Sequence, residues 1–200
     1  MPFNERTALL SKLEFEPVTP ERWADLEQLF GPRGATGGCW CMLWRLKRSD
    51  YDRQKGDGNK QAMKSIVEHG PPPGILAYLE GEPVGWGAIQ PREVYPALGR
   101  SRILKPVDEQ PVWSITCFFV RKDLRGQGLS VRLIRAAVTY AASQGATIIE
   151  AYPVEPKSDN MPAVFAWVGF AASFRQAGFK EVLRRSETRP IMRLELSKPA

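Results

Sequence analysis

The stretch that decides the fold runs from residue 112 to residue 143 and reads VWSITCFFV (112–120), RKDLRGQGLS (121–130) and VRLIRAAVTYAAS (131–143). Its first part is apolar and rich in β-branched and aromatic residues, which is typical of a buried strand. Alternation predicts one strand face made of Trp113, Ile115, Cys117 and Phe119. Its last part has the spacing of an amphipathic helix, with an apolar stripe of Val131, Ile134, Val138 and Ala141. The segment therefore predicts a strand, a tight loop and a helix.

Two glycines, Gly126 and Gly128, lie where the chain turns from this strand into this helix. They carry no side chains, so we expect the amide N–H groups of the turn to face outward without cover. The first N–H groups of a helix lack intrahelical acceptors and lie at the positive end of the helix dipole, and this combination binds phosphate or pyrophosphate. The loop therefore predicts a site for a phosphorylated cofactor.

The spacing within the loop separates several kinds of phosphate site. A dinucleotide-binding loop would need Gly or Ala where Val131 stands, and a nucleoside-triphosphate loop would need Gly-Lys-Ser/Thr, which is absent here. The run Arg125-Gly-Gln-Gly-Leu-Ser130 instead resembles the acetyl-coenzyme A loop of the GNAT N-acetyltransferase superfamily, Arg/Gln-x-x-Gly-x-Gly/Ala. Ser130 takes the last small position, and the apolar Val120 lies five residues ahead of the motif, as in the family. The alternative is a plain turn between a strand and a helix.

The resemblance implies acetyl-coenzyme A as cosubstrate and the transfer of its acetyl group to a primary amine. It also implies that the loop binds the pyrophosphate, while the end of the central strand follows the pantetheine arm and directs a backbone amide at the thioester oxygen. The residues concerned are Phe118, Phe119, Val120, Arg125, Gly126, Gln127, Gly128, Leu129, Ser130 and Val131. For the three strand residues, core packing is a second role that is compatible with the first.

The remaining chain has strands and helices in the order that the GNAT fold is known for. The expected strands are 13–18, 75–79, 84–89, 112–120, 147–152, 179–185 and 191–196, and the expected helices are 19–30, 59–68, 131–143 and a short one ending at Gly178. Residues 80–83, Glu-Gly-Glu-Pro, indicate a hairpin. We predict an α/β fold (α+β mixed) with one central mixed, mostly antiparallel sheet flanked by helices. A single domain covers residues 1–200, with an irregular insertion at about 91–111.

The composition agrees with one soluble, enzyme-sized domain. The chain has 200 residues, of which 43% are hydrophobic, so it can bury a core without disulfides. Three cysteines and an N-terminus unlike a signal peptide predict a reducing, cytoplasmic setting. No apolar run approaches the ~20 residues of a membrane helix. The net charge of +6 is compatible with a polyanionic cofactor, and its Lys and Arg residues are scattered along the chain.

The catalytic residues are harder to place. Glu150 is the one carboxylate in the two strands expected to border the cleft, so it is the candidate general base; a solvent-facing glutamate at a strand end is the alternative. The usual proton donor of the family is a tyrosine four residues before the Gly-Phe pair at 178–179. Phe174 occupies that place here, so Tyr152 or another tyrosine would have to reach in. A buried Cys117 is expected to pack as a small apolar residue.

The segment Gly37-Gly-Cys-Trp-Cys-Met-Leu-Trp-Arg45 is the most unusual part of the chain. No metal is expected, because a zinc site would need distant ligands to converge, namely Cys39, Cys41, Cys117 and His69. A Trp-rich loop after the first helix can form a wall or lid over an acceptor pocket, or it can anchor a long loop through apolar contacts. Asp159 and Asn160 could supply acceptor contacts or belong to a stiff connector.

Three classes of function are open. The leading one is an N-acetyltransferase that binds acetyl-coenzyme A and an amine together, with direct attack by the amine in a ternary complex. The alternative is a non-catalytic acyl-coenzyme A-binding module. A basic nucleic-acid binder would need a clustered Lys/Arg face or stacking aromatics, and the sequence indicates neither. The expected partner is a small-molecule or peptide amine, without nucleic acid or membrane; whether two chains pair as a homodimer stays open.

Overall fold

One seven-stranded sheet organises the part of the chain that the computed structural model describes, residues 10–157 and 167–196. Its strands lie in the order β1-β2-β3-β4-β5-β7-β6. Neighbouring strands are antiparallel except β4 and β5, which are parallel. The bounds are β1 Leu13–Pro17, β2 Gly74–Leu79, β3 Glu82–Pro91, β4 Trp113–Val120, β5 Ile148–Ala151, β6 Lys180–Arg184 and β7 Pro190–Glu195. The predicted central mixed, mostly antiparallel sheet is confirmed.

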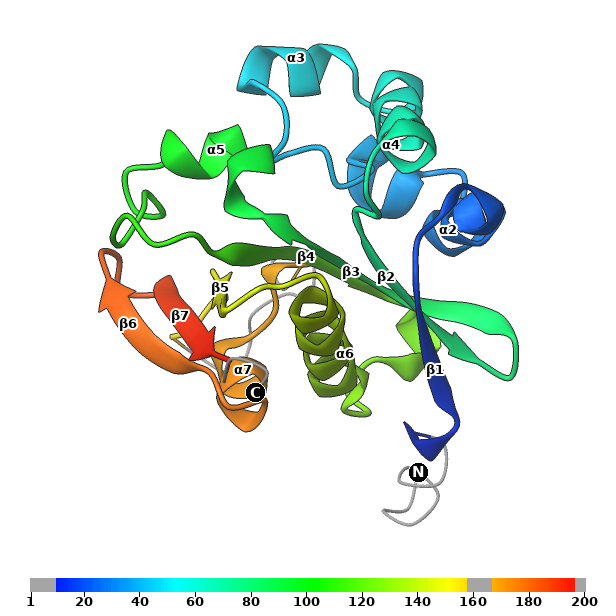
Figure 1. Ribbon diagram of the computed structural model, residues 1–200. Coiled ribbons are helices and arrows are strands. Elements are labelled where there is room, and N and C mark those ends of the chain that lie inside the picture. The colour runs from blue at the N-terminus through cyan, green and yellow to red at the C-terminus, as the bar shows by residue number, and fades with distance from the viewer. Residues whose placement is uncertain (1–9, 158–166, 197–200) are drawn as a thin grey trace.

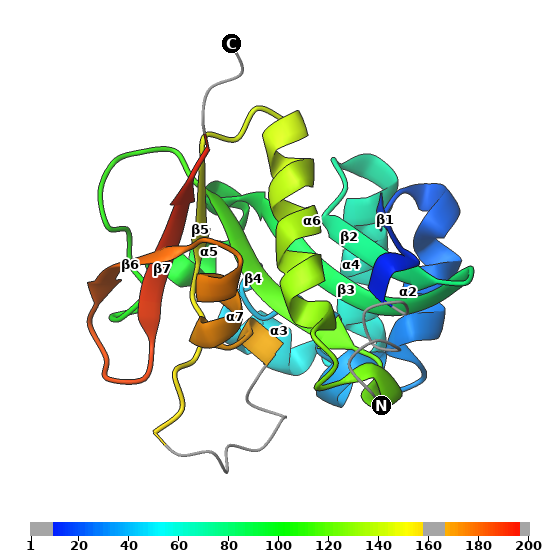
Figure 2. The ribbon, with the colours of Figure 1, turned by 90° about the horizontal axis from the view of Figure 1, so that it is seen from below.

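Helices cover both faces of this sheet (Figure 1). Seen from below, α6 and α7 lie across one face, while α2, α3, α4 and α5 lie behind the sheet (Figure 2). No helix in the described ranges is both long and apolar enough to cross a lipid bilayer. The helix bounds are α2 Trp23–Phe30, α3 Arg48–Arg53, α4 Asp57–His69, α5 Pro96–Gly99, α6 Leu129–Ser143 and α7 Ala171–Gln176.

Helix α6 forms where the sequence has helical apolar spacing, and it packs on the middle of the sheet. Its buried residues are Leu129, Leu133, Ile134, Ala137 and Ala141. The predicted stripe is therefore partly wrong, because Val131 and Val138 are only half-buried at its border. The helix is rotated so that Leu133 and Ala137 face the strands. Each fully buried Leu or Ile of this stripe contributes about 1.5–3 kcal/mol to folding.

A bulge in β4 changes which of its side chains face which core. Ala88 of β3 pairs with Cys117, but the next residue, Ile89, pairs with Ile115, so Thr116 is an extra residue on β4. Such a bulge reverses the alternation that follows it. Ile115 and Phe118 consequently lie in the core under α6, while Cys117 lies in the core on the α2 side. The prediction that Ile115 and Cys117 share a face is wrong.

The region 91–111, predicted as an irregular insertion, has local structure. It contains a 3₁₀ turn, η3 (Arg92–Val94), and the short helix α5. Tyr95, Leu98 and Leu104 are buried there and form a third apolar cluster with Tyr152 and Ile191. This cluster holds the segment against the ends of β5 and β7.

The sheet opens between its two parallel strands. β4 and β5 pair through only three residues each, Trp113–Ile115 with Ile149–Ala151. Beyond Ala151 the chain leaves β4 and bonds elsewhere: Val154 forms a bridge with Phe170, and the amide of Glu155 donates to the carbonyl of Thr188. The second half of β4 therefore has no strand partner on its β5 side within the described residues. This parting places an open backbone edge next to the start of α6.

Candidate functional site

The turn between β4 and α6 presents the amide groups that the sequence predicts. Gly126 and Gly128 have φ angles of 73° and 89°, in the left-handed region that glycine adopts without steric cost. Gly128 caps α6 at its N-terminus, so the amides of Leu129 and Ser130 have no intrahelical acceptor. A Cβ on Gly126 would meet nothing within 4 Å, so the loop is open on its outer side. This end of α6 therefore has the backbone geometry that suits an anion.

Side chains of the loop brace it from the strand side. The Nε of Arg125 donates to the carbonyl of Val120 at 2.9 Å, and its guanidinium carbon lies 5.9 Å from the centre of the Phe119 ring. The Nε2 of Gln127 donates to the carbonyl of Asp123 at 2.8 Å. Arg125 thus holds the loop to β4.

Residues 118–120, predicted to follow the cofactor, lie on the part of β4 that has parted from β5. Their side chains point to opposite faces of the sheet. The ring of Phe118 is 5.9 Å from that of Phe174 on the α6 side, and the ring of Phe119 is 5.6 Å from that of Phe30 on the α2 side. These residues therefore combine core packing with an open backbone edge.

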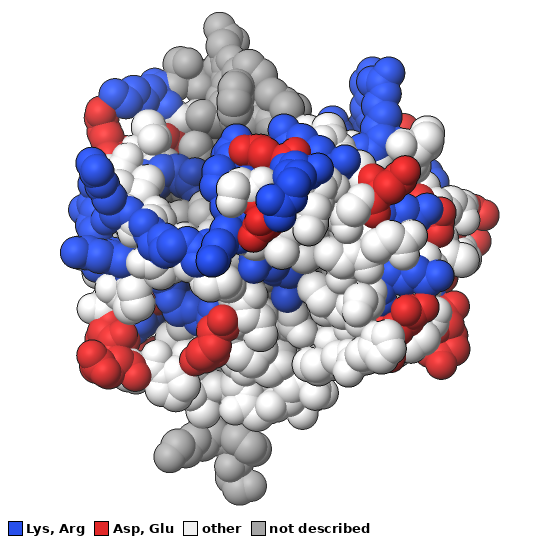
Figure 3. Space-filling view, turned by 90° about the horizontal axis from the view of Figure 1, so that it is seen from above, with Lys and Arg blue, Asp and Glu red and all other residues white. Residues whose placement is uncertain are grey.

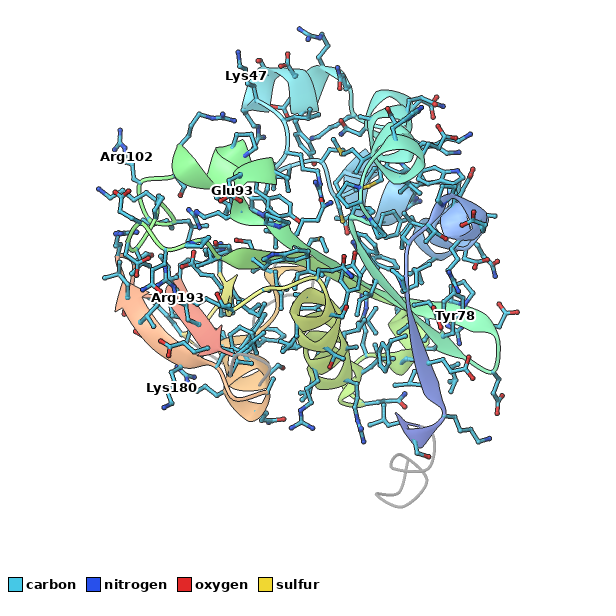
Figure 4. All side chains as sticks on the ribbon, in the orientation of Figure 1. Lys47, Tyr78, Glu93, Arg102, Lys180 and Arg193 are labelled. Atoms are coloured by element: carbon cyan, nitrogen blue, oxygen red, sulfur yellow. The ribbon has the colours of Figure 1, made fainter. Side chains whose placement is uncertain are left out.

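Glu150 lies in β5, fully buried, at the centre of an ion-pair network. Its Oε1 accepts from Arg92 at 2.7 Å and from the Tyr152 hydroxyl at 2.6 Å. Its Oε2 accepts from the Nε of Arg193 at 2.7 Å, and Arg193 also contacts both carboxylate oxygens of Asp108. Arg193 lies on β7, on the left of the molecule in the side-chain view (Figure 4). Both carboxylate oxygens of the candidate base, Glu150, thus already accept hydrogen bonds from other side chains of the protein.

Two buried tyrosines lie near the point where the strands part. Tyr152 is hydrogen-bonded to Ser114 at 2.8 Å as well as to Arg92 and Glu150. Burial, together with the negative charge of Glu150, holds the pKa of Tyr152 well above its usual range. Burial also raises the pKa of Tyr95, and its hydroxyl accepts from Arg45 at 3.1 Å. Both phenols keep their protons at neutral pH, and both have partners within the described residues.

Phe174, at the family's usual tyrosine position, is a core residue. It is fully buried, and its ring packs against Phe118 and, edge-on at 5.1 Å, against Phe179. A Cβ on Gly169 would lie 2.9 Å from the Phe174 ring, which shows how closely the connecting segment approaches it. The residue at this position therefore packs against Phe118 and has no hydroxyl that could donate a proton.

The segment around Cys39 and Cys41 anchors a loop to the sheet. Trp40 is buried and stacks on Trp23 at 5.8 Å. Cys41 is buried, accepts a hydrogen bond from Trp86 and donates one to Cys117 at 3.2 Å. Hydrogen bonding to Cys117 and burial raise the pKa of Cys41, so its thiol stays protonated. Within the described ranges, no group of three or more His, Cys, Asp or Glu side chains is arranged to hold a metal ion.

The same loop continues into the wall of a hollow on the α4 side of the sheet. The hollow encloses about 470 Å³ and is lined by Met42, Arg45, Leu46, Ser65, Ile66, His69, Gly70, Pro71, Gln90 and Val94. The Trp-rich loop has two parts. Trp40 anchors the loop through its contact with Trp23, and Met42, Arg45 and Leu46 line the hollow. Asp159 and Asn160 lie outside the described residues.

Sequence reasoning missed the polar residues that distant elements bring together at two places: Arg45 and Gln90 at the hollow, and Arg92 and Arg193 around Glu150. Arg45 comes from a loop, Gln90 from the end of β3, Arg92 from η3 and Arg193 from β7. A weak signal was present, because Gln90 and Arg193 interrupt apolar strand sequences. The contacts of Gln90 and Arg193 depend on the sheet order, which places β3 beside β4 and β7 beside β5.

Comparisons with known proteins agree with this arrangement. Residues 40–170 match the model of the Acetyltransferase (GNAT) family. A search of curated proteins gave no significant match.

Several solved structures share the fold. One is a GNAT-family acetyltransferase from Listeria monocytogenes, with 13% identity and a TM-score of 0.57 over 92% of this chain and 95% of that one. Another is the aminoglycoside acetyltransferase AAC(6')-Ib in complex with coenzyme A and kanamycin, with 20% identity and a TM-score of 0.51 over 92% and 94% of the two chains. A GNAT-family protein from Desulfovibrio desulfuricans has 15% identity and a TM-score of 0.51 over 92% and 98%.

Proposed function

Because the chain belongs to the acetyltransferase (GNAT) family, we propose that it is an N-acetyltransferase that moves an acetyl group from acetyl-coenzyme A to a primary amine by direct attack in a ternary complex. The observation that carries this proposal is the accessible amide end of α6, which lies beside the parted strands β4 and β5. An anion site next to an open strand edge can bind both ends of a long cofactor that has a pyrophosphate and an amide-containing arm. A neighbouring fold, that of AAC(6')-Ib, is recorded with coenzyme A bound.

The residues of the loop fit such a cofactor. With the left-handed Gly128 as the N-cap, the amides of Leu129 and Ser130 have no intrahelical acceptor, and these groups would bind the pyrophosphate. The side chain of Arg125 is turned back to Val120, so its charge adds to the site without closing it. Phe118, Phe119 and Val120 would then supply the backbone edge along which the pantetheine arm lies.

Acetyl transfer from a thioester to an amine requires few catalytic groups from the protein. Bound acetyl-coenzyme A supplies an acetyl thioester, whose C–S bond breaks as the new C–N bond forms and the amine loses a proton. An amide on the free edge of β4 would donate to the thioester oxygen and stabilise the charge that develops there. Positioning two substrates together is itself a large part of the rate enhancement.

Glu150 as the general base stays a prediction. Its contacts support a positioning role, because both of its oxygens accept hydrogen bonds from arginine or tyrosine. To take a proton from an amine, Glu150 would first have to release one of these partners. We propose that Glu150 holds Arg92, Arg193 and Tyr152 in place beneath the site, and that the amine loses its proton to water.

Steady-state kinetics with two substrates test the proposal. The purified protein is mixed with acetyl-coenzyme A and a panel of primary amines, and the release of coenzyme A thiol is followed. Transfer in a ternary complex predicts intersecting reciprocal plots, whereas a covalent acetyl-enzyme predicts parallel ones. Binding of coenzyme A by calorimetry without turnover of any amine would favour the non-catalytic binding module instead.

A further inference from the structure

Two residues that line the hollow on the α4 side of the sheet each have a buried polar atom without a partner in the described part of the chain. One is the Oε1 of Gln90, a residue only 2% exposed, whose Nε2 donates to the carbonyl of Pro71. The other is the Nε of Arg45, whose Nη2 donates to Tyr95. A buried polar atom without a partner costs free energy, so native proteins rarely leave one unless a ligand or water completes it. The hollow thus offers one acceptor and one charged donor.

The hollow connects with the proposed reaction site through direct contacts. Gln90 pairs across the sheet with Ser114 of β4, and Ser114 is bonded to Tyr152 at the point where the strands part. Arg45 lies over the ring of Tyr95 at 4.5 Å, and Tyr95 in turn is hydrogen-bonded to the bulged Thr116 of β4. A molecule in the hollow therefore lies on the α4 side of the same β4 segment whose free edge the cofactor would follow.

The charge around the hollow is positive. None of its lining residues is an Asp or Glu. Arg45, Lys47 and Arg100 form no ion pair in the residues that the structure describes, although the Nη2 of Arg100 donates to the carbonyl of Leu46 in the wall. In the view from above, Lys and Arg side chains gather mainly on the left, with acidic side chains among them (Figure 3), and Lys47 lies at the start of α3 (Figure 4). Two exposed acids lie next in the sequence to lining residues: Glu93 beside Val94, and Glu68, which is paired with Lys64 at 3.7 Å, beside His69.

We infer that the hollow binds the acceptor, and that the acceptor is a primary amine which also carries a carboxylate. This inference rests on the proposed acetyltransferase function and names its substrate class. The guanidinium of Arg45 binds the carboxylate through a charge-assisted hydrogen bond, and the carbonyl oxygen of Gln90 accepts an N–H or O–H of the same molecule. One unpaired cation in a hollow without acids suits a single negative charge. A polycationic aminoglycoside does not match it.

The experiment compares acceptors that differ only at the carboxylate. Acetyl transfer is measured for a panel of free L-amino acids, for the corresponding C-terminal amides and for kanamycin. We expect the free acids to have a kcat/KM at least about tenfold higher than that of their amides, the magnitude of one charge-assisted hydrogen bond. A preference for the amides or for kanamycin overturns the inference.

Variants at Arg45 test the assigned residue. Arg45→Gln should reduce the acid-to-amide ratio of kcat/KM to within about twofold of one, and Arg45→Lys should retain most of the preference because it keeps the charge. The control is Arg48→Gln, which removes an exposed arginine three residues further on that is paired with Asp52. The ratio is taken within each preparation, so partial unfolding of a variant cancels. An unchanged ratio in Arg45→Gln overturns the role of Arg45.

A binding measurement separates this inference from the proposed function. If no amine is acetylated although coenzyme A binds, the function fails, and calorimetry with the same free amino acids and amides then decides the inference. Binding of the acids by the wild type that is lost in Arg45→Gln supports the site. Equal binding of acids and amides, or binding of neither, overturns it.

Discussion

At the scale of single residues, the proposed anion site depends on Gly128, where any side chain would strain the backbone and would also crowd the amides. Gly128 has a φ of 89° at the N-cap of α6, where a side chain would be strained and would lie beside the bare amides. An aspartate there would also place a negative charge at the positive end of the helix dipole, where the pyrophosphate is expected.

Gly128→Asp should therefore abolish binding of coenzyme A. Isothermal calorimetry on the folded variant measures it. The control is Gly145→Asp, at the other end of α6, which has a similar φ of 85°; a Cβ there would meet nothing within 4 Å, and one on Gly128 would meet only Leu10, in ordinary contact at 3.6 Å. Equal affinities in both variants would mean that the loop is only a turn. Arg125→Ala should weaken binding less, because its side chain braces the loop.

Phe174 lies too deep in the core for a hydroxyl to be added without cost. Phe174→Tyr would bury an oxygen among Phe118, Phe179 and Gly169, and an unpaired buried hydroxyl costs about 1–3 kcal/mol. We expect the free energy of unfolding to fall by that amount and turnover to change by less than about tenfold, since a thiolate with a pKa near ~8.5 can leave without a committed acid. Urea unfolding and the thiol-release assay measure the two effects. A strong gain of activity in an otherwise inactive protein would show that the missing phenol is the catalytic acid.

Glu150 gives the sharpest contrast between a catalytic and a positioning role. Glu150→Gln leaves Arg92 and Arg193 with one charge fewer between them, and removing one member of a buried ion pair costs about 3–5 kcal/mol. We expect a large fall in Tm and an unchanged shape of the pH–rate profile. Glu195→Gln, an exposed position two residues beyond Arg193 on β7, is the control for both readouts. A loss of ~10²-fold in kcat with normal stability and a lost acidic limb would establish Glu150 as the base.

At the scale of elements, the segment that leaves β5 is fixed by a charged cluster. Glu155 follows the bridge at Val154 and contacts Arg175 of α7 and Arg184 of β6. Hydrogen bonds from Arg184, and then from Arg175, hold the pKa of Glu155 below its usual value of 4.5. One carboxylate thus joins three pieces of chain: the segment that leaves β5, α7 and β6.

Because the pKa of Glu155 is lower in the folded chain than in the unfolded one, its contribution to stability is present above pH 4.5 and is lost as the pH falls through the folded pKa. The wild type should therefore be more stable than Glu155→Gln at neutral pH, and the difference should shrink as the solution is acidified below pH 4.5. Thermal unfolding of both proteins across this range measures it. A difference that stays constant with pH would mean that the charge of Glu155 is not what holds the segment.

At the scale of the whole molecule, two halves of the sheet meet at a short seam. β1 to β4 form one half and β5 to β7 the other, and the two pair through three residues of β4 and three of β5. A cofactor that lies between the parted strands and on the end of α6 would contact both halves. Because such a cofactor would bind the folded chain and not the unfolded one, its binding must raise the free energy of unfolding.

Coenzyme A at a hundred times its Kd should raise the free energy of unfolding by about 2.7 kcal/mol, which for a domain of this size is a rise in Tm of about 5–10 °C. Differential scanning fluorimetry over a concentration series measures the shift. The Gly128→Asp variant should show none. A wild type whose Tm does not respond to coenzyme A would contradict the proposed cofactor site.

The sequence alone determined the features that depend on local pattern. The strand, glycine loop and helix of residues 112–143 and the order of the elements follow from apolar periodicity and turn residues, because neighbours in the chain decide them. The mixed sheet was implied by the resemblance of that order to the GNAT fold. The left-handed turn at Gly126 and Gly128 was predictable from its neighbours in the chain, whereas its binding of an anion stays a prediction. Gly126 and Gly128 act through their own backbone, and no distant residue is needed to explain them.

Tertiary structure decided everything that depends on which residues meet. The bulge at Thr116 shifts the faces of β4, and one extra residue against β3 leaves no mark on the pattern of β4 itself. The surroundings of Glu150 come from η3 and β7, and the hollow joins Arg45 to Gln90 across the α4 side of the sheet. Such partners lie 43 to 58 residues apart or on different elements, so only the order and register of the strands determine that they are neighbours.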